Sequence, residues 1–183
     1  AGTIAYTGVL ADYRRYLTPA PFYTLAGRIL HYGRYGGNAD DPRLPPLFIG
    51  YPQLVRGYDI GSFDAVECAG AAASCPAFDR LLGSRMLVAS AEFRFPLLRP
   101  LGVRQGMYGP IPVEVAFFAD AGTAWTASET PTFFGGGRKP VASVGVTLRA
   151  NLFGFGVGQM DFARPLQRPG KGWVMGFSLT PGF

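Results

Sequence analysis

The sequence predicts an all-β fold, an antiparallel transmembrane β-barrel with about seven or eight strands in this chain of 183 residues. Seven segments alternate apolar with small or polar residues, and a period of two places the two kinds on opposite faces of a strand. Glycine is abundant, at 26 residues, whereas charged residues make up only 16%, below the roughly 25% of soluble domains. No stretch approaches the ~18 consecutive apolar residues of a membrane helix. We therefore expect a single domain, residues 1–183, that crosses the bacterial outer membrane with strands.

Each expected strand is long enough to cross a hydrocarbon layer at a tilt, which takes about 9–11 residues. In the clearest strand, residues 142–152, every second side chain is apolar and the others are Ser, Gly, Thr, Arg and Asn. Two further strands place Glu92 and Asp120 in the polar rows opposite apolar ones. In chain order, we expect strands at residues 3–16, 22–31, 87–97, 113–122, 142–152, 155–164 and 173–183.

The last expected strand runs to the final residue of the sequence, Phe183. One of its faces is apolar and largely aromatic, and the other is small or polar apart from Val174. A strand of this kind at a chain end is typical of outer-membrane barrels, in which the last strand pairs to close the wall. Pro181 lacks a backbone donor and weakens pairing near that end. The apolar face consists of Trp173, Met175, Phe177, Leu179, Pro181 and Phe183.

The connections predict an orientation for the barrel. Short turns at residues 18–21 and 151–154 alternate with longer segments rich in Gly, Pro and charge. This is the layout of bacterial barrels, with short periplasmic turns and long extracellular loops. The connection at 98–110 is the exception, because it is longer than a periplasmic turn should be. The predicted extracellular loops are 32–84, 126–140 and 165–172.

A soluble barrel with a dry interior is the alternative fold, since its strands also alternate. Two features favour the membrane. The polar rows mix Gly, Ser, Thr and Ala with isolated charges, which differs from a solvated surface. Aromatic residues also gather near the segment ends, where membrane proteins carry their interfacial girdles. These residues are Tyr6, Tyr13, Tyr16, Tyr23, Trp125, Trp173 and Phe183.

Other functional classes find little support. The net charge of +5 comes from scattered Lys and Arg without a nucleic-acid-binding motif, so no nucleic-acid partner is expected. The single histidine, His31, has no convergent acid or nucleophile, and we expect neither an enzyme nor a cofactor. Cys68 and Cys75 are candidates for a local disulfide in an oxidising compartment, and they make a poor metal site without a nearby histidine.

The long loop contains one arginine that fits the charges on the strands. Arg56 precedes Gly57, which allows a sharp backbone bend and close approach to a wall. Glu92 and Asp120 face the polar side of their strands, and an isolated carboxylate on a partly dehydrated wall needs a partner. A guanidinium binds carboxylates with two parallel hydrogen bonds, which lysine cannot do. We therefore expect a loop folded into the lumen and held by Arg56 against Glu92 and Asp120.

The sequence also resembles a known family in several places. The segment Val55, Arg56, Gly57 and Tyr58 resembles the loop signature of the bacterial surface antigen superfamily, the BamA/TamA-like outer-membrane assembly factors. Residues 117–122 resemble the family's aromatic-x-Asp-x-Gly strand motif, which ends at Gly122. Residues 91–96 resemble the strand that follows the signature loop, and residues 141–166 resemble the closing hairpin. The match covers nearly the whole chain in the right order.

The resemblance implies roles for these residues. It implies that the chain is the C-terminal part of such a barrel and that the loop arginine, here Arg56, contacts the acidic inner wall at Glu92 and Asp120. It also implies a C-terminal strand that serves as a recognition signal. The residues of that signal are Trp173, Gly176, Phe177, Leu179 and Phe183.

The implied function is the insertion or export of polypeptides through the outer membrane without covalent chemistry. The expected partners are outer-membrane lipid and client polypeptides. About seven strands do not close a bacterial barrel in the usual way, so preceding strands, a strand hidden in a loop or further copies of the chain must complete the wall. The alternative function is a membrane anchor or small passive pore formed by a short or oligomeric barrel.

Overall fold

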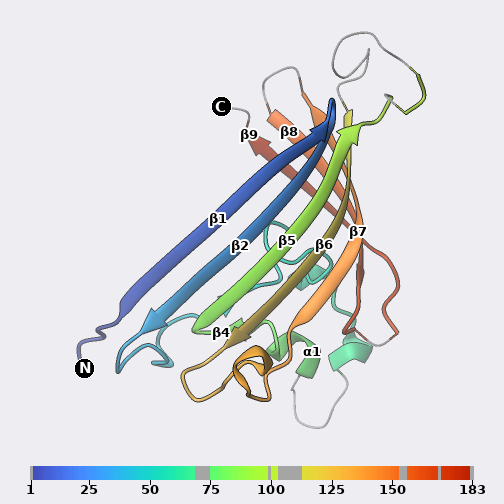
Figure 1. The fold of residues 1–183 in the computed structure, drawn as a ribbon. Coiled ribbons are helices and arrows are strands. Elements are labelled where there is room, and N and C mark those ends of the chain that lie inside the picture. Colours follow the sequence, from blue (N-terminus) through green and yellow to red (C-terminus); the bar gives the residue numbers. More distant parts are fainter. Residues whose placement is uncertain are drawn as a thin grey trace.

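The computed structural model describes residues 2–68, 75–98, 100–102, 113–152, 156–168 and 170–181. Within these residues the main element is one seven-stranded antiparallel sheet in which each strand pairs with its neighbours in the sequence order (Figure 1). The strands, from one edge of the sheet to the other, are β1 (Thr7–Ala20), β2 (Tyr23–Tyr35), β5 (Arg85–Pro96), β6 (Val113–Trp125), β7 (Val141–Asn151), β8 (Gly156–Pro165) and β9 (Val174–Pro181).

The remaining elements lie in the connections. The long segment between β2 and β5 holds two very short strands, β3 (Leu47–Phe48) and β4 (Leu82–Gly83), which pair only with each other. It also holds the single turn of helix α1 (Pro76–Asp79) and two 3₁₀ turns, η1 (Ile60–Ser62) and η2 (Ala65–Cys68). A third 3₁₀ turn, η3 (Thr132–Phe134), lies between β6 and β7. No helix in the described part of the chain is long and apolar enough to span a membrane.

The seven strands expected from the alternation are confirmed. The main difference is at the first hairpin, where β1 runs to Ala20 and β2 to Tyr35, so both strands extend further along the chain than the alternation shows. Pairing with a neighbouring strand continues through residues whose side chains break the pattern, because the backbone supplies the hydrogen bonds. Phe183 and most of the connection at 98–110 lie outside the described residues.

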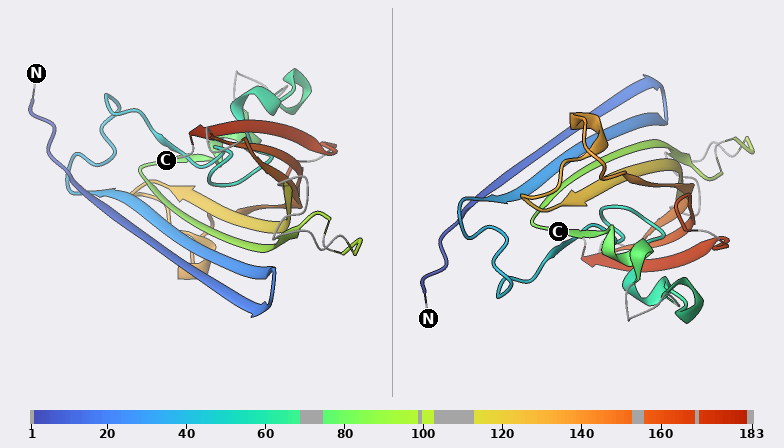
Figure 2. Two further views of the ribbon diagram at one scale, coloured as in Figure 1. Left: turned by 90° about the horizontal axis from the view of Figure 1, so that it is seen from above. Right: turned by 90° about the horizontal axis from the view of Figure 1, so that it is seen from below.

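The sheet is curved and open. Figure 2, which views it from above and from below, shows β1 (blue) and β9 (red) on opposite sides, with the segment between β2 and β5 lying in the hollow between them. Among the described residues, β1 and β9 are the two edges of the sheet, and neither pairs with the other. The expected barrel is therefore present only as an open sheet: these seven strands do not close, as their number indicates, and the short strands β3 and β4 do not add an eighth to the wall.

The two faces of the sheet differ as the strand parity predicts. The convex face is apolar and open to the surroundings, whereas the concave face carries the polar row and is largely covered by the loop between β2 and β5. Every strand except β1 has buried or half-buried side chains on its concave face, while β1 is exposed along its whole length. The large apolar side chains exposed on the convex face include Val9, Tyr13, Leu17, Leu25, Ile29, Phe117, Val144, Met160, Met175, Phe177 and Leu179.

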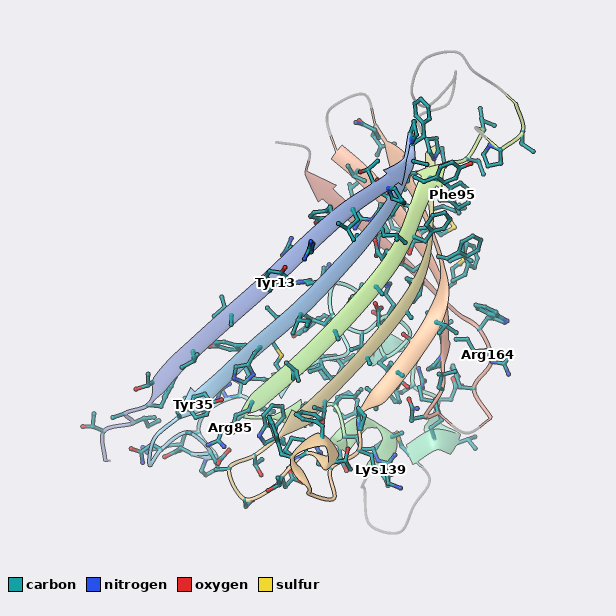
Figure 3. All side chains as sticks on the ribbon, in the orientation of Figure 1. Tyr13, Tyr35, Arg85, Phe95, Lys139 and Arg164 are labelled. Carbon is teal, nitrogen blue, oxygen red and sulfur yellow. A yellow bond between two sulfur atoms is a disulfide. The ribbon has the colours of Figure 1, made fainter. Side chains whose placement is uncertain are left out.

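The loop is held in the hollow by a hydrophobic core of its own. Ile49, Val55 and Tyr58 from the loop are fully buried against Val88 of β5 and Val141 of β7. Each such side chain contributes about 1.5–3 kcal/mol when it leaves water. This packing fixes the segment 49–58 on the wall, at the end of the strands where Figure 3 labels Tyr35, Arg85 and Lys139 and away from Phe95 at the opposite end.

Candidate functional site

The loop segment around Arg56 is shaped by Gly57, where any other residue would be strained. Gly57 has a φ of 84°, in the left-handed region that L side chains rarely adopt. A Cβ atom at Gly57 would also stand 3.0 Å from the Cβ of Ala163 on β8. The bend and the close approach expected from the sequence are thus both present, and they bring Arg56 onto the concave wall.

Arg56 is the centre of the site. Its Nε lies 2.7 Å from Asp120 Oδ2 and its Nη2 lies 2.8 Å from Asp120 Oδ1, so the guanidinium donates two parallel hydrogen bonds to one carboxylate. Its Nη1 lies 2.8 Å from Glu92 Oε1 and donates a hydrogen bond to Thr147 Oγ1 at 3.0 Å. The backbone N–H of Arg56 also donates to Asp120, at 3.2 Å. One loop residue therefore joins three neighbouring strands, β5, β6 and β7.

The guanidinium also lies on an aromatic ring. Its Cζ is 3.6 Å from the centroid of the Phe118 ring, close enough for a strong cation–π contact. Beneath that ring lies Gly145 of β7, where a Cβ would come within 2.7 Å of Phe118 Cζ. Phe118 is therefore held flat between a glycine and the arginine, and it shields the ion pairs on one side from water.

Each residue of the strand motif on β6 faces a residue of the loop motif. Phe118, Asp120 and Gly122 share the concave face at a spacing of two. Phe118 stacks on Arg56 and Asp120 binds it, while Gly122 leaves the space into which Val55 packs. A Cβ at Gly122 would stand 2.7 Å from Val55 Cγ2.

Glu92 connects Arg56 to a wider network of charges. This carboxylate also accepts hydrogen bonds from Arg94 Nε at 2.7 Å and from Arg149 Nη2 at 2.9 Å. Arg149 reaches Glu114 as well, at 3.3 Å. Glu92 thus bridges three arginines, and the network extends along the concave wall from the loop toward the end of the strands with short turns.

Arg56 keeps its charge in spite of its burial. Burial lowers the pKa of Arg56, but the hydrogen bond to Asp120 and the charges of Asp120, Glu92 and Asp161 raise it more, so that its pKa is raised overall. Asp161 on β8 lies 3.9 Å from Nη1 and binds the Thr147 hydroxyl that also contacts Arg56. The arginine is therefore a permanent cation surrounded by carboxylates.

A second set of contacts holds the loop on the far side of Gly57. The hydroxyl of the buried Tyr58 donates to the carbonyl of Ala142 at 2.9 Å, and burial raises the pKa of Tyr58. Arg168, in the connection between β8 and β9, donates to the carbonyl of Gly57 at 2.7 Å. Arg168 also pairs with Glu67, whose Oε2 lies 2.6 Å from Nη2. The Arg168 hydrogen bond lowers the pKa of Glu67 to about 2.

The structure brings most of the site residues expected from the sequence into one place. The contact between loop and wall described above includes Val55, Arg56, Gly57, Tyr58, Glu92, Asp120 and Gly122. Cys68 and Cys75 are joined by a disulfide next to Glu67, at the end of the same loop. No group of three or more His, Cys, Asp or Glu residues among those described is arranged to hold a metal ion.

The terminal strand lies apart from this contact. Phe177 and Leu179 project from the convex face of β9, and Trp173 lies just before the strand; all three are 60% to 70% exposed. Gly176 is on the concave face, opposite Asp161 of β8. Phe183 lies outside the described residues.

Several residues of the site were missed from the sequence. Thr147, Asp161 and Arg149 lie on the concave face, which their parity shows, but nothing in the sequence shows that the register aligns them with Arg56 and Glu92. Arg168 carries no local signal at all, because its partners lie more than 100 residues earlier in the chain.

A family model described as the Omp85 superfamily domain matches residues 2–182, which is nearly the whole chain. No curated protein matches the sequence. The family match confirms the resemblance to surface antigen and BamA/TamA-like barrels that the loop and strand motifs indicate.

Proposed function

This chain belongs to the Omp85 superfamily, whose members are bacterial outer-membrane proteins, and we propose that it forms part of an outer-membrane β-barrel that inserts or exports polypeptides without covalent chemistry. Its proposed partners are outer-membrane lipid and client polypeptides. The family match supports a role in outer-membrane protein assembly or translocation in general. The observation that carries the proposal for this chain is the contact of Arg56 with Asp120, Glu92 and Phe118.

This contact is suited to holding a loop in a lumen. A buried ion pair adds little net stability, because removing two charges from water costs about as much as their attraction returns. Loss of one partner alone is costly, at about 3–5 kcal/mol, because the other charges stay buried without compensation. Arg56 therefore fixes one position of the loop against the wall. We propose that this position keeps the lumen in the shape that a passing or inserting polypeptide requires.

The two edges of the sheet support the proposal that the chain binds extended polypeptides. The edge strands β1 and β9 each present backbone donors and acceptors that no described strand pairs. In lipid, each unpaired backbone group costs several kcal/mol, so the edges require partners. An extended client segment can supply them by adding a strand to an edge. Preceding strands of a larger barrel, or a second copy of the chain, complete the wall when no client is bound.

The convex face supports the proposed location of the sheet in a membrane. It carries large apolar side chains on β1, β2, β6, β7, β8 and β9, and an apolar surface of that extent is rare on a soluble monomer. The aromatic rings of Tyr23, Phe93, Phe95 and Phe117 contact one another near the short-turn end, where an interfacial girdle is expected.

The test is to replace Arg56 by Ala and to measure barrel assembly and client insertion. We expect less of the heat-modifiable, folded form and a loss of client insertion, because Asp120 and Glu92 lose their shared cation. Arg43→Ala is the matched control, since Arg43 lies in the same loop, has a side chain that is about half exposed, and pairs with Asp41 and the carbonyl of Gly2. If Arg56→Ala assembles and inserts clients like the parent chain, the proposed role of the contact is wrong.

A passive pore is the second candidate, and one cavity favours it. Below the loop, a polar cavity of about 190 Å³ is lined by Arg14, Arg28, Arg94, Arg149, Gln159 and Ser178 among others. If the chain is a pore that the loop closes, Arg56→Ala will raise its conductance in planar bilayers without affecting any client. If it is an assembly factor, the same substitution will abolish client insertion.

A further inference from the structure

The convex face is interrupted by a line of small side chains. Cross-strand pairing aligns Arg15 of β1 with Gly27 of β2, Ala91 of β5, Ala119 of β6 and Val144 of β7. The next line toward the long loops also contains small residues, at Ala89, Ala121 and Ala142. The line on the other side is bulky and consists of Leu17, Leu25, Phe93, Phe117 and Val146.

These differences in size produce a hollow on the outside of the sheet. A groove of about 490 Å³ is bordered by Tyr13, Arg15 and Ile29 and floored by the small residues of β5, β6 and β7. A second groove of about 560 Å³ lies toward the short turns. Both grooves include Arg15, Gly27, Ala91 and Ala119, so they form one continuous depression, which we call the outer trough.

Arg15 is the single charged side chain that borders the outer trough from the convex side. It makes no hydrogen bond or ion pair with any described residue, whereas its neighbours Arg14 and Arg28 both bind Asp12 on the concave face. By strand parity, no Asp or Glu occupies the convex face of any of the seven strands. The protein therefore offers this cation no counter-ion on its own side of the sheet.

In a membrane, an arginine without a counter-ion raises the free energy of the protein. An arginine on the lipid face of a barrel costs about 2–4 kcal/mol at the bilayer midplane and less near the interface. Arg15 stands five residues before Ala20, the end of its strand. At ~3.4 Å per residue and a tilt of about 45°, that is roughly 12 Å from the end of the strand, less than the ~15 Å half-thickness of the hydrocarbon core, so Arg15 lies in the leaflet on the short-turn side and its long side chain extends toward the phosphates of that leaflet.

We propose that Arg15 and the outer trough bind a phosphate-bearing lipid of the surrounding membrane. The guanidinium binds the phosphate, whose oxygens match its fork of donors. An acyl chain lies in the trough over Ala91 and Ala119 and extends toward Ala121, in the direction of the bilayer centre. The proposal rests on the membrane location included in the proposed function and is independent of client handling.

The test measures which lipids stay bound to the chain. The full chain is inserted into vesicles of phosphatidylglycerol that also contain dioleoylglycerol, then extracted in detergent and analysed by native mass spectrometry. We expect the parent chain to retain phosphatidylglycerol and Arg15→Gln to retain it about tenfold less. Ala91→Leu should also reduce retention, because it fills the trough while leaving Arg15 in place. Dioleoylglycerol, which has acyl chains but no phosphate, should not be retained.

Arg164→Gln is the matched control. Arg164 also faces outward, from β8 at the right of Figure 3, but it borders neither groove. Its substitution should leave lipid retention unchanged. Equal retention by the parent chain and Arg15→Gln, or an equal loss with Arg164→Gln, would overturn the proposal. The proposed function fails separately, when Arg56→Ala leaves client insertion intact while lipid retention still depends on Arg15.

Discussion

At the scale of single residues, the site depends on two kinds of side chain that act together. Arg56 supplies the attraction between loop and wall, and the glycines at 57, 122 and 145 supply the space that lets it approach. A charged contact of this kind needs both, because hydrogen bonds at 2.7 Å form only when nothing larger stands between the backbones. The glycines that leave this space are therefore as important to the contact between loop and wall as the charges are.

Gly122 gives the clearest test at this scale. In Gly122→Ala the new Cβ would stand 2.7 Å from Val55 Cγ2, so Val55 and the loop must move. Overpacking of this kind costs about 1–3 kcal/mol. We expect lower resistance to unfolding in guanidinium chloride and faster proteolysis of the loop. Val55→Ala should restore much of the loss when combined with Gly122→Ala, since the clash is between these two side chains.

The control for this substitution is Gly8→Ala on β1. Gly8 also lies in a strand, but a Cβ there would meet no atom within 4 Å. Gly8→Ala should leave both measurements nearly unchanged. If Gly122→Ala behaves like Gly8→Ala, the close packing of Val55 on β6 is not required for docking of the loop.

At the scale of the elements, the loop between β2 and β5 is attached at two points. Arg56 attaches it to β5, β6 and β7, and Arg168 attaches it to the connection between β8 and β9. The second attachment contains the ion pair of Arg168 with Glu67, next to the Cys68–Cys75 disulfide. The two attachments together hold the loop across most of the width of the sheet.

The second attachment should weaken in acid. The hydrogen bond from Arg168 lowers the pKa of Glu67 to about 2, below its usual value near 4.5 in an unfolded chain. A lowered pKa in the folded state contributes stability above about pH 4.5, and this contribution is lost as the pH falls toward 2. We expect the loop of the parent chain to become more sensitive to an acid-tolerant protease over that interval.

Glu67→Gln separates this group from the other carboxylates. The variant should show a more sensitive loop at pH 7 and a smaller change between pH 4.5 and 2 than the parent chain. Equal changes in the two chains would mean that protonation of Glu67 does not loosen the loop.

The sequence predicted the strands and their two faces better than the contacts between distant side chains. Strand parity is a local property, so it correctly placed Glu92 and Asp120 on the concave face and Phe177 on the convex one. It also indicated the contact of Arg56, because the carboxylates on that wall need a cationic partner and Arg56 precedes a glycine that allows close approach. Thr147 and Arg168 could not be found this way, since their positions depend on the register of distant strands and on the path of a loop. The number of strands indicated that the sheet does not close by itself, but the curvature of the sheet could not be predicted, because it is a property of all the strands together.

At the scale of the whole molecule, the open sheet sets the last prediction. β1 is exposed on both faces along its whole length, and its outer edge pairs with no described strand. Figure 2 shows it on the opposite side of the hollow from β9. Closing the seven strands into a ring would require tighter curvature than the loop packed in the hollow allows, since Ile49, Val55 and Tyr58 already fill that space.

We therefore expect that this chain, refolded alone in detergent, does not form a closed monomer. A heat-modifiable band on a gel should appear only for a species whose mass in detergent is a multiple of the 19.6 kDa chain. Added preceding strands from a longer Omp85 barrel should replace the second copy, because either one satisfies the backbone groups of β1 and β9. A heat-modifiable monomer would contradict this expectation, and it would mean that β1 and β9 meet after displacement of the loop. The Arg56→Ala chain distinguishes these cases, since release of the loop should favour the monomer only if the loop is what keeps the edges apart.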